Sequence, residues 1–292
     1  MNILLYSKEN NIDNWKYLEI CINELNAKKI KIWFLKDFYK KINNQINQNI
    51  KCTVISKLQS DFEIDFLLSF GGDGTMLSAA NIVKGYNIPM IGVNTGRLGF
   101  LANVAKNNIK KLIFDLENKN FNVSQRSLID IRIKPMLKNE ENYFALNELS
   151  ICGEDNAMIN IKAYLNEEYL NNYWGDGLII STPTGSTGYS LSCGGPIIMP
   201  DTNNFIITPI ASHNLNVRPL IISDQNEVKL ELDNRFETFK LSIDGLPYDI
   251  TNKHIIFIKK STSFINLLIT KENSYLHTLR NKLLWGLDKR NS

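Results

Sequence analysis

A glycine-rich turn between an apolar strand and a helix constrains the fold of this chain most strongly. The turn is Gly71-Gly72-Asp73-Gly74-Thr75, which follows the apolar run Phe66–Phe70 and precedes a helical pattern that opens at Met76. Glycines let the backbone approach an anion closely, and successive amides at the start of a helix bind phosphate oxygens. The segment therefore predicts a strand, loop and helix that together bind phosphate.

Asp73 is the unexpected residue of this turn, because a carboxylate repels phosphate. A carboxylate in such a place can instead orient an attacking hydroxyl or take its proton. We therefore predict phosphoryl transfer to a hydroxyl group, with Asp73 as the catalytic residue.

The composition indicates a globular protein and limits the classes of partner. The chain has 292 residues, 43% hydrophobic and 22% charged, which suits one large domain or two of ordinary size. A net charge of +3 without a dense Lys/Arg tract argues against nucleic acid as a partner. Met1–Ser7 is not a basic leader, and no apolar run reaches the about 18–20 residues of a membrane span. We expect a cytoplasmic protein that has no membrane partner, no disulfide and no zinc site.

The first third of the chain alternates strands with amphipathic helices. Apolar residues three or four positions apart predict one helix from Trp15 to Leu25, capped by Asp13, and another from Ile109 to Leu116. We interpret Lys31–Lys41 as a strand edge and a solvated face. The alternation predicts an α/β domain, Rossmann-like, with a mostly parallel sheet. The predicted strands are residues 1–7, 30–35, 52–55, 66–70 and 88–93.

From about Phe121 the pattern changes to short β segments separated by turns, which predicts an all-β carboxy-terminal domain. A final helix starts at Tyr275 and ends at Trp285-Gly286, and we expect it to return to the first domain, because the β domain offers no helical layer. The predicted domains are residues 1–122 with 271–292, and residues 123–270. The predicted strands of the second domain are residues 127–133, 142–151, 159–165, 178–182, 205–209, 228–232, 239–243, 254–258 and 264–269.

Three further segments carry groups suited to a nucleotide. Gly92–Phe100 is a second glycine-rich turn after a strand, so both turns are expected at the carboxyl ends of parallel strands, facing one cleft. Asn147 and Glu148 interrupt an apolar strand with groups suited to an adenine edge and to ribose hydroxyls. The segment Ser181–Ser190 is dense in glycines and hydroxyl residues, and its Tyr189 is placed to stack on a base. Taken singly, each segment also fits an ordinary turn or an exposed strand position.

In their order along the chain, these segments resemble the motifs of the NAD kinase family. A GGDGT motif alone is not specific, because diacylglycerol and sphingosine kinases share it, and the chain has neither a P-loop nor a G-x-G-x-x-G fingerprint. The ordered set is specific and runs over most of the chain. The similar segments, each with the family motif that it resembles in parentheses where one is named, are Gly71–Thr75 (GGDGT), Asn94–Leu101 (the second glycine loop), Asn147-Glu148 (NE), Asp176–Ser190 (GDG followed by TPTGSTAYS), Asn216–Leu220 and Leu279–Gly286.

The resemblance implies an enzyme that makes NADP from NAD, with ATP as phosphoryl donor and Mg²⁺ or another divalent cation as cofactor. It implies that Asp73 acts on the 2′-hydroxyl of the adenosine ribose and that the protein is a homo-oligomer, a dimer or tetramer. Because Mg²⁺ bound to triphosphate usually retains waters, no dedicated protein cage for the metal is expected. The resemblance implies that NAD and nucleotide are bound by Gly72, Asp73, Gly74, Thr75, Phe100, Asn147, Glu148, Asp176, Thr187, Gly188, Tyr189, Ser190, Leu191, Ser192 and Ala211.

The chain departs from the family pattern at three positions, and two other functions remain as alternatives. Trp174 stands where a basic residue is frequent, Gly188 where alanine is usual, and Leu246 where glutamine often follows the Asp-Gly turn. One alternative is a lipid kinase of the diacylglycerol class, which does not account for the segment Thr182–Ser192. The other is a dinucleotide-binding regulator without turnover, in which loss of Asp73 would be expected.

Overall fold

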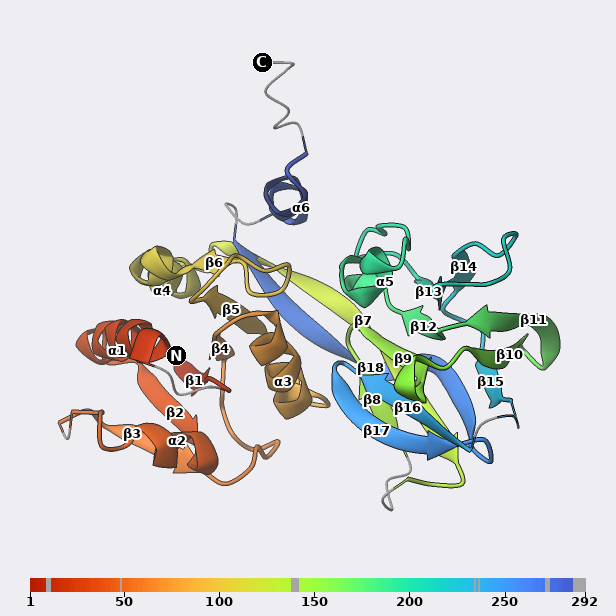
Figure 1. The fold of residues 1–292 in the computed structure, drawn as a ribbon. Helices are drawn as coiled ribbons and strands as arrows, with labels where there is room; N and C mark the ends of the chain where they lie inside the picture. The colour runs from red at the N-terminus through yellow and green to blue at the C-terminus, as the bar shows by residue number, and fades with distance from the viewer. Residues whose placement is uncertain are drawn as a thin grey trace. The chain divides into compact units, whose positions relative to one another are not determined.

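The chain folds as two compact units, Met1–Gln125 with Ile265–Ser292, and Arg126–Phe264. The computed structural model describes residues 1–8, 12–47, 49–137, 142–233, 235, 237–270 and 274–285 (Figure 1). The predicted cap by the Asp13 side chain and the predicted helix end at Gly286 lie outside what is described.

The first unit is built on the parallel strands β1 (Asn2–Tyr6), β2 (Lys31–Leu35), β3 (Cys52–Ile55), β4 (Phe66–Phe70) and β5 (Met90–Asn94). Their order is β3-β2-β1-β4-β5, with every neighbouring pair parallel, as the sequence predicts. The order reverses at β1 and β4, because the chain first builds outward through β2 and β3 and then continues on the other side of β1. The short strand β6 (Val104–Ala105) lies parallel to β5, and so does the end of β18 (Ile255–Thr270).

Helices accompany these strands, and their apolar faces are buried as the spacing predicts. In α1 (Ile12–Ala27), Leu18, Ile22 and Leu25 are buried. In α4 (Ile109–Glu117), the predicted apolar positions Ile109, Leu112, Ile113 and Leu116 are likewise buried, whereas Phe114 is exposed. The other helices of this unit are α2 (Lys36–Ile42), α3 (Asp73–Val83), the 3-10 turn η1 (Lys106–Asn108) and α6 (Tyr275–Leu283).

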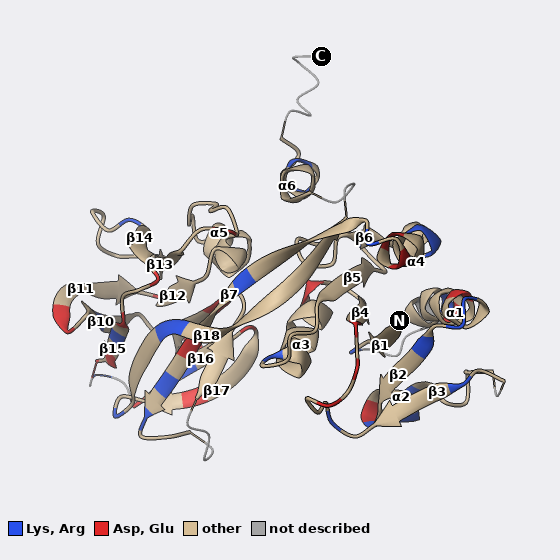
Figure 2. Cartoon of the chain, turned by 180° about the vertical axis from the view of Figure 1, so that it is seen from behind, with Lys and Arg blue, Asp and Glu red and all other residues tan. Residues whose placement is uncertain are grey.

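Charged residues of α1 and α4 are marked in Figure 2, and the two helices are linked by an ion pair. Lys28, just after α1, places its Nζ 2.7 Å from Oε2 of Glu117 at the end of α4. Lys111 and Asp115 form a second pair, one turn apart on α4, with Nζ 3.6 Å from Oδ2. Ion pairs with exposed members contribute little to stability, so burial of the apolar faces dominates the packing of the two helices.

The prediction for the basic region Lys31–Lys41 is partly wrong, because only the first half of this region is a strand. The second half forms α2, in which Phe38 and Ile42, one helical turn apart, are both buried. The i, i+4 spacing of these two apolar residues is the helical signal in this segment.

The final helix α6 belongs to the first unit, as predicted. Ser274 caps it, since its hydroxyl accepts a hydrogen bond from the backbone N–H of His277 at 3.2 Å. Leu279 is buried, and the Lys282 ammonium lies 5.8 Å from the centroid of the Phe100 ring.

The second unit is built from antiparallel strands. One sheet has the order β14-β13-β12-β9-β16-β17, and its strands are β9 (Glu148–Gly153), β12 (Gly177–Ser181), β13 (Asn204–Ile210), β14 (Leu220–Ser223), β16 (Thr238–Ile243) and β17 (Leu246–Thr251). A second run has the order β11-β10-β15-β18, with β7 beside β18 and β8 beside β7. Its further strands are β7 (Phe121–Lys134), β8 (Tyr143–Ala145), β10 (Ile159–Leu165), β11 (Glu168–Gly175) and β15 (Val228–Leu232).

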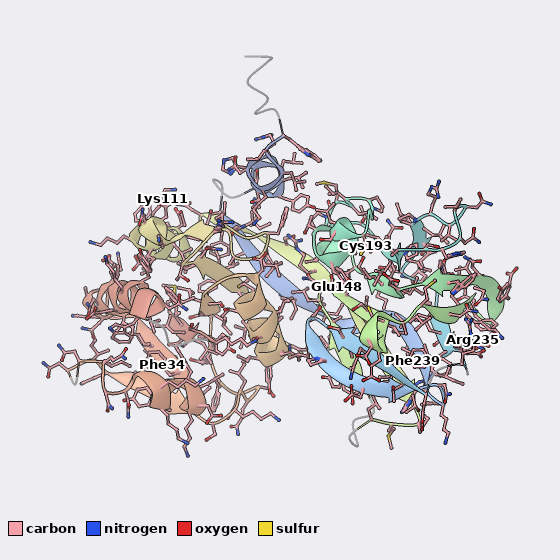
Figure 3. The ribbon with its side chains drawn as sticks, in the orientation of Figure 1. Phe34, Lys111, Glu148, Cys193, Arg235 and Phe239 are labelled. Atoms are coloured by element: carbon pink, nitrogen blue, oxygen red, sulfur yellow. The ribbon has the colours of Figure 1, made fainter. Side chains whose placement is uncertain are left out.

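Alternating side chains from both groups of strands form one buried core. Val228, Leu230 and Leu232 of β15 face inward, while Lys229 and Glu231 between them do not. Phe239 of β16 is fully buried in the same core, as Phe34 of β2 is in the core of the first unit (Figure 3). Helical structure in this unit is short: η2 (Glu154–Asn156), η3 (Thr184–Thr187) and α5 (Tyr189–Ser192).

Two predicted turns of the second unit are tight hairpin turns. Asp244 and Gly245, between β16 and β17, have φ of 47° and 80°, and Asn166 and Glu167, between β10 and β11, have φ of 49° and 69°. Residues with positive φ at both central positions match the twist of antiparallel hairpins. The sequence prediction missed β11, β14 and β17, and it divided the single strand β18 into two. Among the described residues, the helices are too short or too polar to cross a membrane.

Candidate active site

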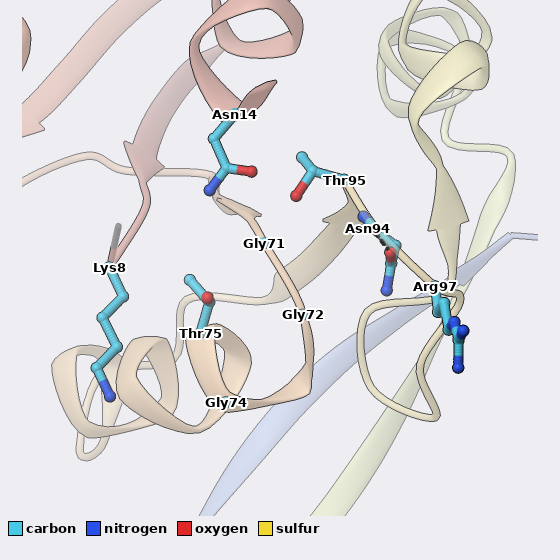
Figure 4. A pocket seen from close by; sticks show the side chains of 10 residues that line it. Lys8, Asn14, Gly71, Gly72, Gly74, Thr75, Asn94, Thr95 and Arg97 are labelled. Carbon is cyan, nitrogen blue, oxygen red and sulfur yellow. Dashed lines mark hydrogen bonds between the residues drawn. The ribbon is translucent and has the colours of Figure 1, made fainter. Parts of the chain in front are cut away.

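A pocket of about 310 Å³ lies in the first unit where the strand order reverses. Open α/β sheets bind ligands at this position, outside the carboxyl ends of the strands. Both glycine-rich turns contribute to its wall, so the prediction that they face one cleft is confirmed (Figure 4). The lining residues are Lys8, Asn14, Gly71, Gly72, Gly74, Thr75, Asn94, Thr95, Gly96 and Arg97.

The chemistry of this lining suits an anion. Gly72 caps the N-terminus of α3 without a side chain, so the first amides of the helix and its positive end are available to a ligand. The Lys8 and Arg97 side chains flank the Gly71–Gly74 loop in the view of Figure 4. Neither cation forms an ion pair with a carboxylate among the described residues. Two uncompensated cations beside a helix N-terminus favour a phosphate chain over a neutral ligand.

The shape of the first loop depends on Gly71. Its φ is 149°, and a Cβ at this position would collide with the hydroxyl of Thr75. Thr75 is buried in the first turn of α3, where its N–H donates to the carbonyl of Gly72 at 3.0 Å. The backbone can therefore turn closely around the pocket only with glycine at position 71.

Asp73 joins the two glycine-rich turns to each other. Its carboxylate accepts three backbone N–H groups of the second turn, from Phe100 at 2.8 Å, Leu101 at 3.0 Å and Ala102 at 2.9 Å. The approach is so close that a Cβ on Gly99 would collide with the Asp73 carboxylate. A carboxylate has about four acceptor positions, so one position on Oδ2 is left for a further donor. The geometry holds the Asp73 carboxylate in a fixed orientation with one acceptor position to spare.

A second carboxylate clamp lies in the second unit, around Asn147 and Glu148. Asp244, in the turn between β16 and β17, accepts the N–H groups of Leu146 at 2.7 Å, Asn147 at 2.8 Å and Glu148 at 3.1 Å. Sequence reasoning treated Asp244 only as a turn residue and missed this role. The clamp fixes the backbone from which the Asn147 and Glu148 side chains project.

Glu148 lies in surroundings that oppose its ionisation. The pKa of Glu148 is raised to about 7, mainly by burial and then by the charge of Asp244, while a hydrogen bond from the Tyr189 backbone partly offsets both. Burial also raises the pKa of Asp244, against the effect of its three amide bonds. Oε2 of Glu148 and Oδ1 of Asn147 are buried and have no hydrogen-bond partner among the described residues. Two buried acceptors without donors cost free energy that a ligand carrying hydroxyl or amino groups would recover.

Several hydroxyl groups of the hydroxyl-rich segment form hydrogen bonds within the protein. Thr182 Oγ1 donates to the carbonyl of Leu146 at 2.6 Å, and Thr187 Oγ1 donates to the carbonyl of Thr184 at 3.2 Å. The Ser190 hydroxyl is fully buried and lies 2.8 Å from that of Thr208. The Thr182 hydroxyl and the Thr182 N–H, which donates to the carbonyl of Asn147 at 2.9 Å, tie the segment to the backbone around Asn147, and the hydroxyls of Thr182, Thr187 and Ser190 act as structural groups.

The turn from Gly188 into α5 leaves some of its side chains exposed. Gly188 precedes α5, and a Cβ there would lie 2.7 Å from Oε2 of Glu148. The Tyr189 side chain is 41% exposed, which leaves its ring available for stacking. Leu191 is half-buried and Ser192 is exposed on the same short helix.

Asp176 and Ala211 lie together at the ends of β12 and β13. The Asp176 N–H donates to the carbonyl of Ile210 at 3.0 Å, and Ala211 has a φ of 43°, an unusual value for alanine. Nearby, the rings of Trp174 and His213 are in contact, with their centroids 4.3 Å apart and their planes tilted by 38°.

The predicted site residues therefore form two groups, one in each unit. The first unit holds Gly72, Asp73, Gly74, Thr75 and Phe100, and the second holds the others. Sequence reasoning missed Lys8, Asn14 and Asp244 and gave Arg97 no role. Lys8 follows the first strand, and it reaches the pocket only because the strand order of the sheet reverses there.

Comparison with known proteins gives a consistent result over both units. Residues 9–121 match the model of the ATP-NAD kinase N-terminal domain, and residues 146–268 match that of the ATP-NAD kinase C-terminal domain. The chain is 40% identical over its full length to the NAD kinase of Christiangramia forsetii, 100% of which is covered. It is 48% identical to the NAD kinase of Flavobacterium psychrophilum over 79% of each chain. Its fold is similar to that of yeast NADH kinase crystallised with NADH, with a TM-score of 0.88, 21% identity, and coverage of 100% of this chain and 89% of the other.

Proposed function

The chain belongs to the ATP-NAD kinase family, and we propose how its residues divide the work of this family's reaction. It is an ATP-dependent NAD kinase, which makes NADP from NAD. The family match sets aside the lipid kinase alternative. The observation that carries the proposal is the Asp73 carboxylate, held by three backbone amides beside a phosphate-binding pocket.

Asp73 is proposed to act on the 2′-hydroxyl of the adenosine ribose of NAD. Its one remaining acceptor position suits a single O–H donor, and the three amide bonds prevent the carboxylate from rotating. Because the three amide bonds fix the carboxylate, orientation of the attacking oxygen carries much of the effect of Asp73. As the ribose oxygen bonds to the γ-phosphorus of ATP, its proton passes to Asp73, the bond from that phosphorus to the bridging oxygen breaks, and ADP leaves.

The pocket beside Gly71–Thr75 is proposed to bind the phosphates of ATP. Amides at the start of α3 and the side chains of Lys8 and Arg97 supply donors and positive charge. We propose Mg²⁺ as the accompanying cation, which would neutralise charge on the phosphates when bound with ATP. The lining fits this division, because the amides of α3 and the side chains of Lys8 and Arg97 would hold the phosphates, so that the metal needs no dedicated protein cage.

In the second unit, NAD is proposed to bind at Asn147 and Glu148, which offer their buried acceptors to hydroxyl or amino groups of the dinucleotide. Asp176 and Ala211 are proposed to border the same ligand, and the ring of Tyr189 to stack on the adenine. Thr187, Gly188, Ser190, Leu191 and Ser192 are proposed as the adenosine wall. In the first unit, Phe100 and Thr75 are proposed as nucleotide-binding residues.

Further assignments follow from the family resemblance. We propose functional domains of residues 1–122 with 271–292, and of residues 123–270. We also propose a homo-oligomer, a dimer or tetramer, that works in the cytoplasm without nucleic acid or membrane partners.

The experiment is a coupled assay of purified protein with NAD, ATP and Mg²⁺, in which an NADP-specific dehydrogenase reports the product. NADP formation that requires all three components is the expected result. Omission of the metal, or its removal with EDTA, is expected to abolish turnover. Tight NAD binding without NADP formation would identify a regulator instead and would overturn the proposal.

A further inference from the structure

A second cavity, of about 490 Å³, lies in the second unit among residues that the proposed reaction does not use. It is formed by β10, the end of β15 and the turn from β17 into β18. Its volume falls in the range of small-molecule sites. The side chains that the ligand would meet include Asn160, Lys162, Lys253 and His254, with Ile255 as the apolar part of the wall.

The two carboxylates in the wall of this cavity are already engaged. Glu231 Oε1 lies 3.3 Å from Lys229 Nζ, and its Oε2 accepts the Tyr164 hydroxyl at 3.1 Å. Asp233 pairs with Arg235, whose Nε lies 2.6 Å from Oδ2 and whose backbone N–H lies 3.0 Å from Oδ1. Neither Lys229 nor Arg235 is part of the lining. The negative charge of the wall is therefore balanced from outside the cavity.

The positive charges of the two lysines in the lining are not balanced by carboxylates in this way. Lys162 and Lys253 form no ion pair with a carboxylate among the residues that the structure describes. Lys162 projects from β10 on the side away from the buried Ile161 and Ala163, and Lys253 lies in the turn before β18. Two uncompensated ammonium groups on one cavity favour an anionic ligand.

The neutral groups of the lining favour hydroxyls on that ligand. The Asn160 side chain donates to the Asp233 carboxylate, which fixes its NH₂ group there and leaves Oδ1 as a buried acceptor without a partner among the described residues. His254 Nδ1 accepts the N–H of Thr251 at 2.9 Å, so its proton is on Nε2, which is left as a donor. One acceptor and one donor beside two cations are complementary to a hydroxylated anion.

From these contacts we propose that this cavity is a second ligand site, which binds a small phosphorylated sugar. The phosphate lies between the Lys162 and Lys253 ammonium groups, and the sugar hydroxyls meet Asn160 Oδ1 and His254 Nε2. The carbon face of the sugar packs on Ile255, which pairs with Glu231 on the same face of the sheet as Lys162. No bond is made or broken, and the site is separate from the residues assigned to NAD and ATP.

The test is isothermal titration of the full-length protein with ribose 5-phosphate in the presence of saturating NAD. We expect saturable binding that Lys162→Ala and Lys253→Ala each weaken about tenfold or more, because each removes a charge-assisted contact. Lys259→Ala, an exposed lysine of β18 outside the lining, is the matched control and should leave binding unchanged.

Three results would overturn the proposal. They are absence of binding at millimolar concentration, displacement of ribose 5-phosphate by NAD, and equal affinity for inorganic phosphate, which would mean that the hydroxyls contribute nothing. Ribose without phosphate should not bind. Turnover of NAD in the coupled assay is read in parallel, so failure of this site and failure of the proposed kinase activity are separate outcomes.

Discussion

Glu148→Gln tests the electrostatics of the buried acidic pair in the second unit. The folded protein raises the pKa of Glu148 from 4.5 to about 7, first through burial and then through the charge of Asp244. Between these two values the folded state holds a proton that the unfolded state releases. Stability from the neutral Glu148 is therefore fully present below about pH 4.5 and is lost as the pH rises through about 7.

The size of the change in unfolding free energy follows from the same pKa shift of Glu148. With about 1.4 kcal/mol for each pKa unit, the Glu148 contribution falls by about 2 to 3 kcal/mol between pH 5 and pH 8. Glutamine has nearly the same shape as protonated glutamate but does not titrate. We expect Glu148→Gln and the parent protein to have similar stability at pH 5, and the variant to be more stable by about 2 to 3 kcal/mol at pH 8.

The assay is urea denaturation at both pH values, with Glu168→Gln on the exposed end of β11 as the control. The control should show the same difference from the parent protein at pH 5 and pH 8. Two results would refute the reasoning. One is a stability difference between Glu148→Gln and the parent protein that does not change with pH. The other is a parent protein that becomes more stable relative to the variant as the pH rises.

Four other substitutions probe the two carboxylate clamps and the anion pocket. Gly99→Ala places a Cβ against the Asp73 carboxylate and should lower kcat by about 100-fold without loss of the circular dichroism spectrum; unchanged kcat would contradict the clamp. Lys8→Ala and Arg97→Ala should each raise KM for ATP by about tenfold while KM for NAD stays constant, and equal effects on both substrates would argue against a donor pocket. Asp244→Asn removes a charge that opposes ionisation and should lower the pKa of Glu148, as measured by NMR of the labelled carboxyl group; a higher pKa would show that the amide clamp matters more than the charge.

The fold could be predicted where local pattern and burial agree. The strands of the first unit are short apolar runs, and the spacing of Leu18, Ile22 and Leu25 matches the buried face of α1. The sequence prediction missed β11 because its side chains are mostly polar and half-exposed, without the alternation of an ordinary half-buried strand. Likewise, α2 has only seven residues and follows β2 directly, so the strand signal obscured it.

The site could be predicted only where a motif carries the residue. The first loop, Asn147 and Glu148 belong to motifs, whereas Asp244 lies 96 residues beyond Glu148 and meets it only through strand pairing. Lys8 likewise reaches the pocket through the strand order of the sheet, which no local pattern contains. Tertiary structure, and not local sequence, decides such long-range contacts.

Asp73→Asn provides the most direct test of the assignment of Asp73. Asparagine keeps the size of the side chain but removes its charge and basicity. The account predicts that kcat falls by about 10³-fold while the NAD dissociation constant, measured by titration, stays close to that of the parent protein. Asp61→Asn, an exposed residue outside both glycine-rich turns, is the control. Full turnover by Asp73→Asn would contradict the role of Asp73 at the ribose hydroxyl.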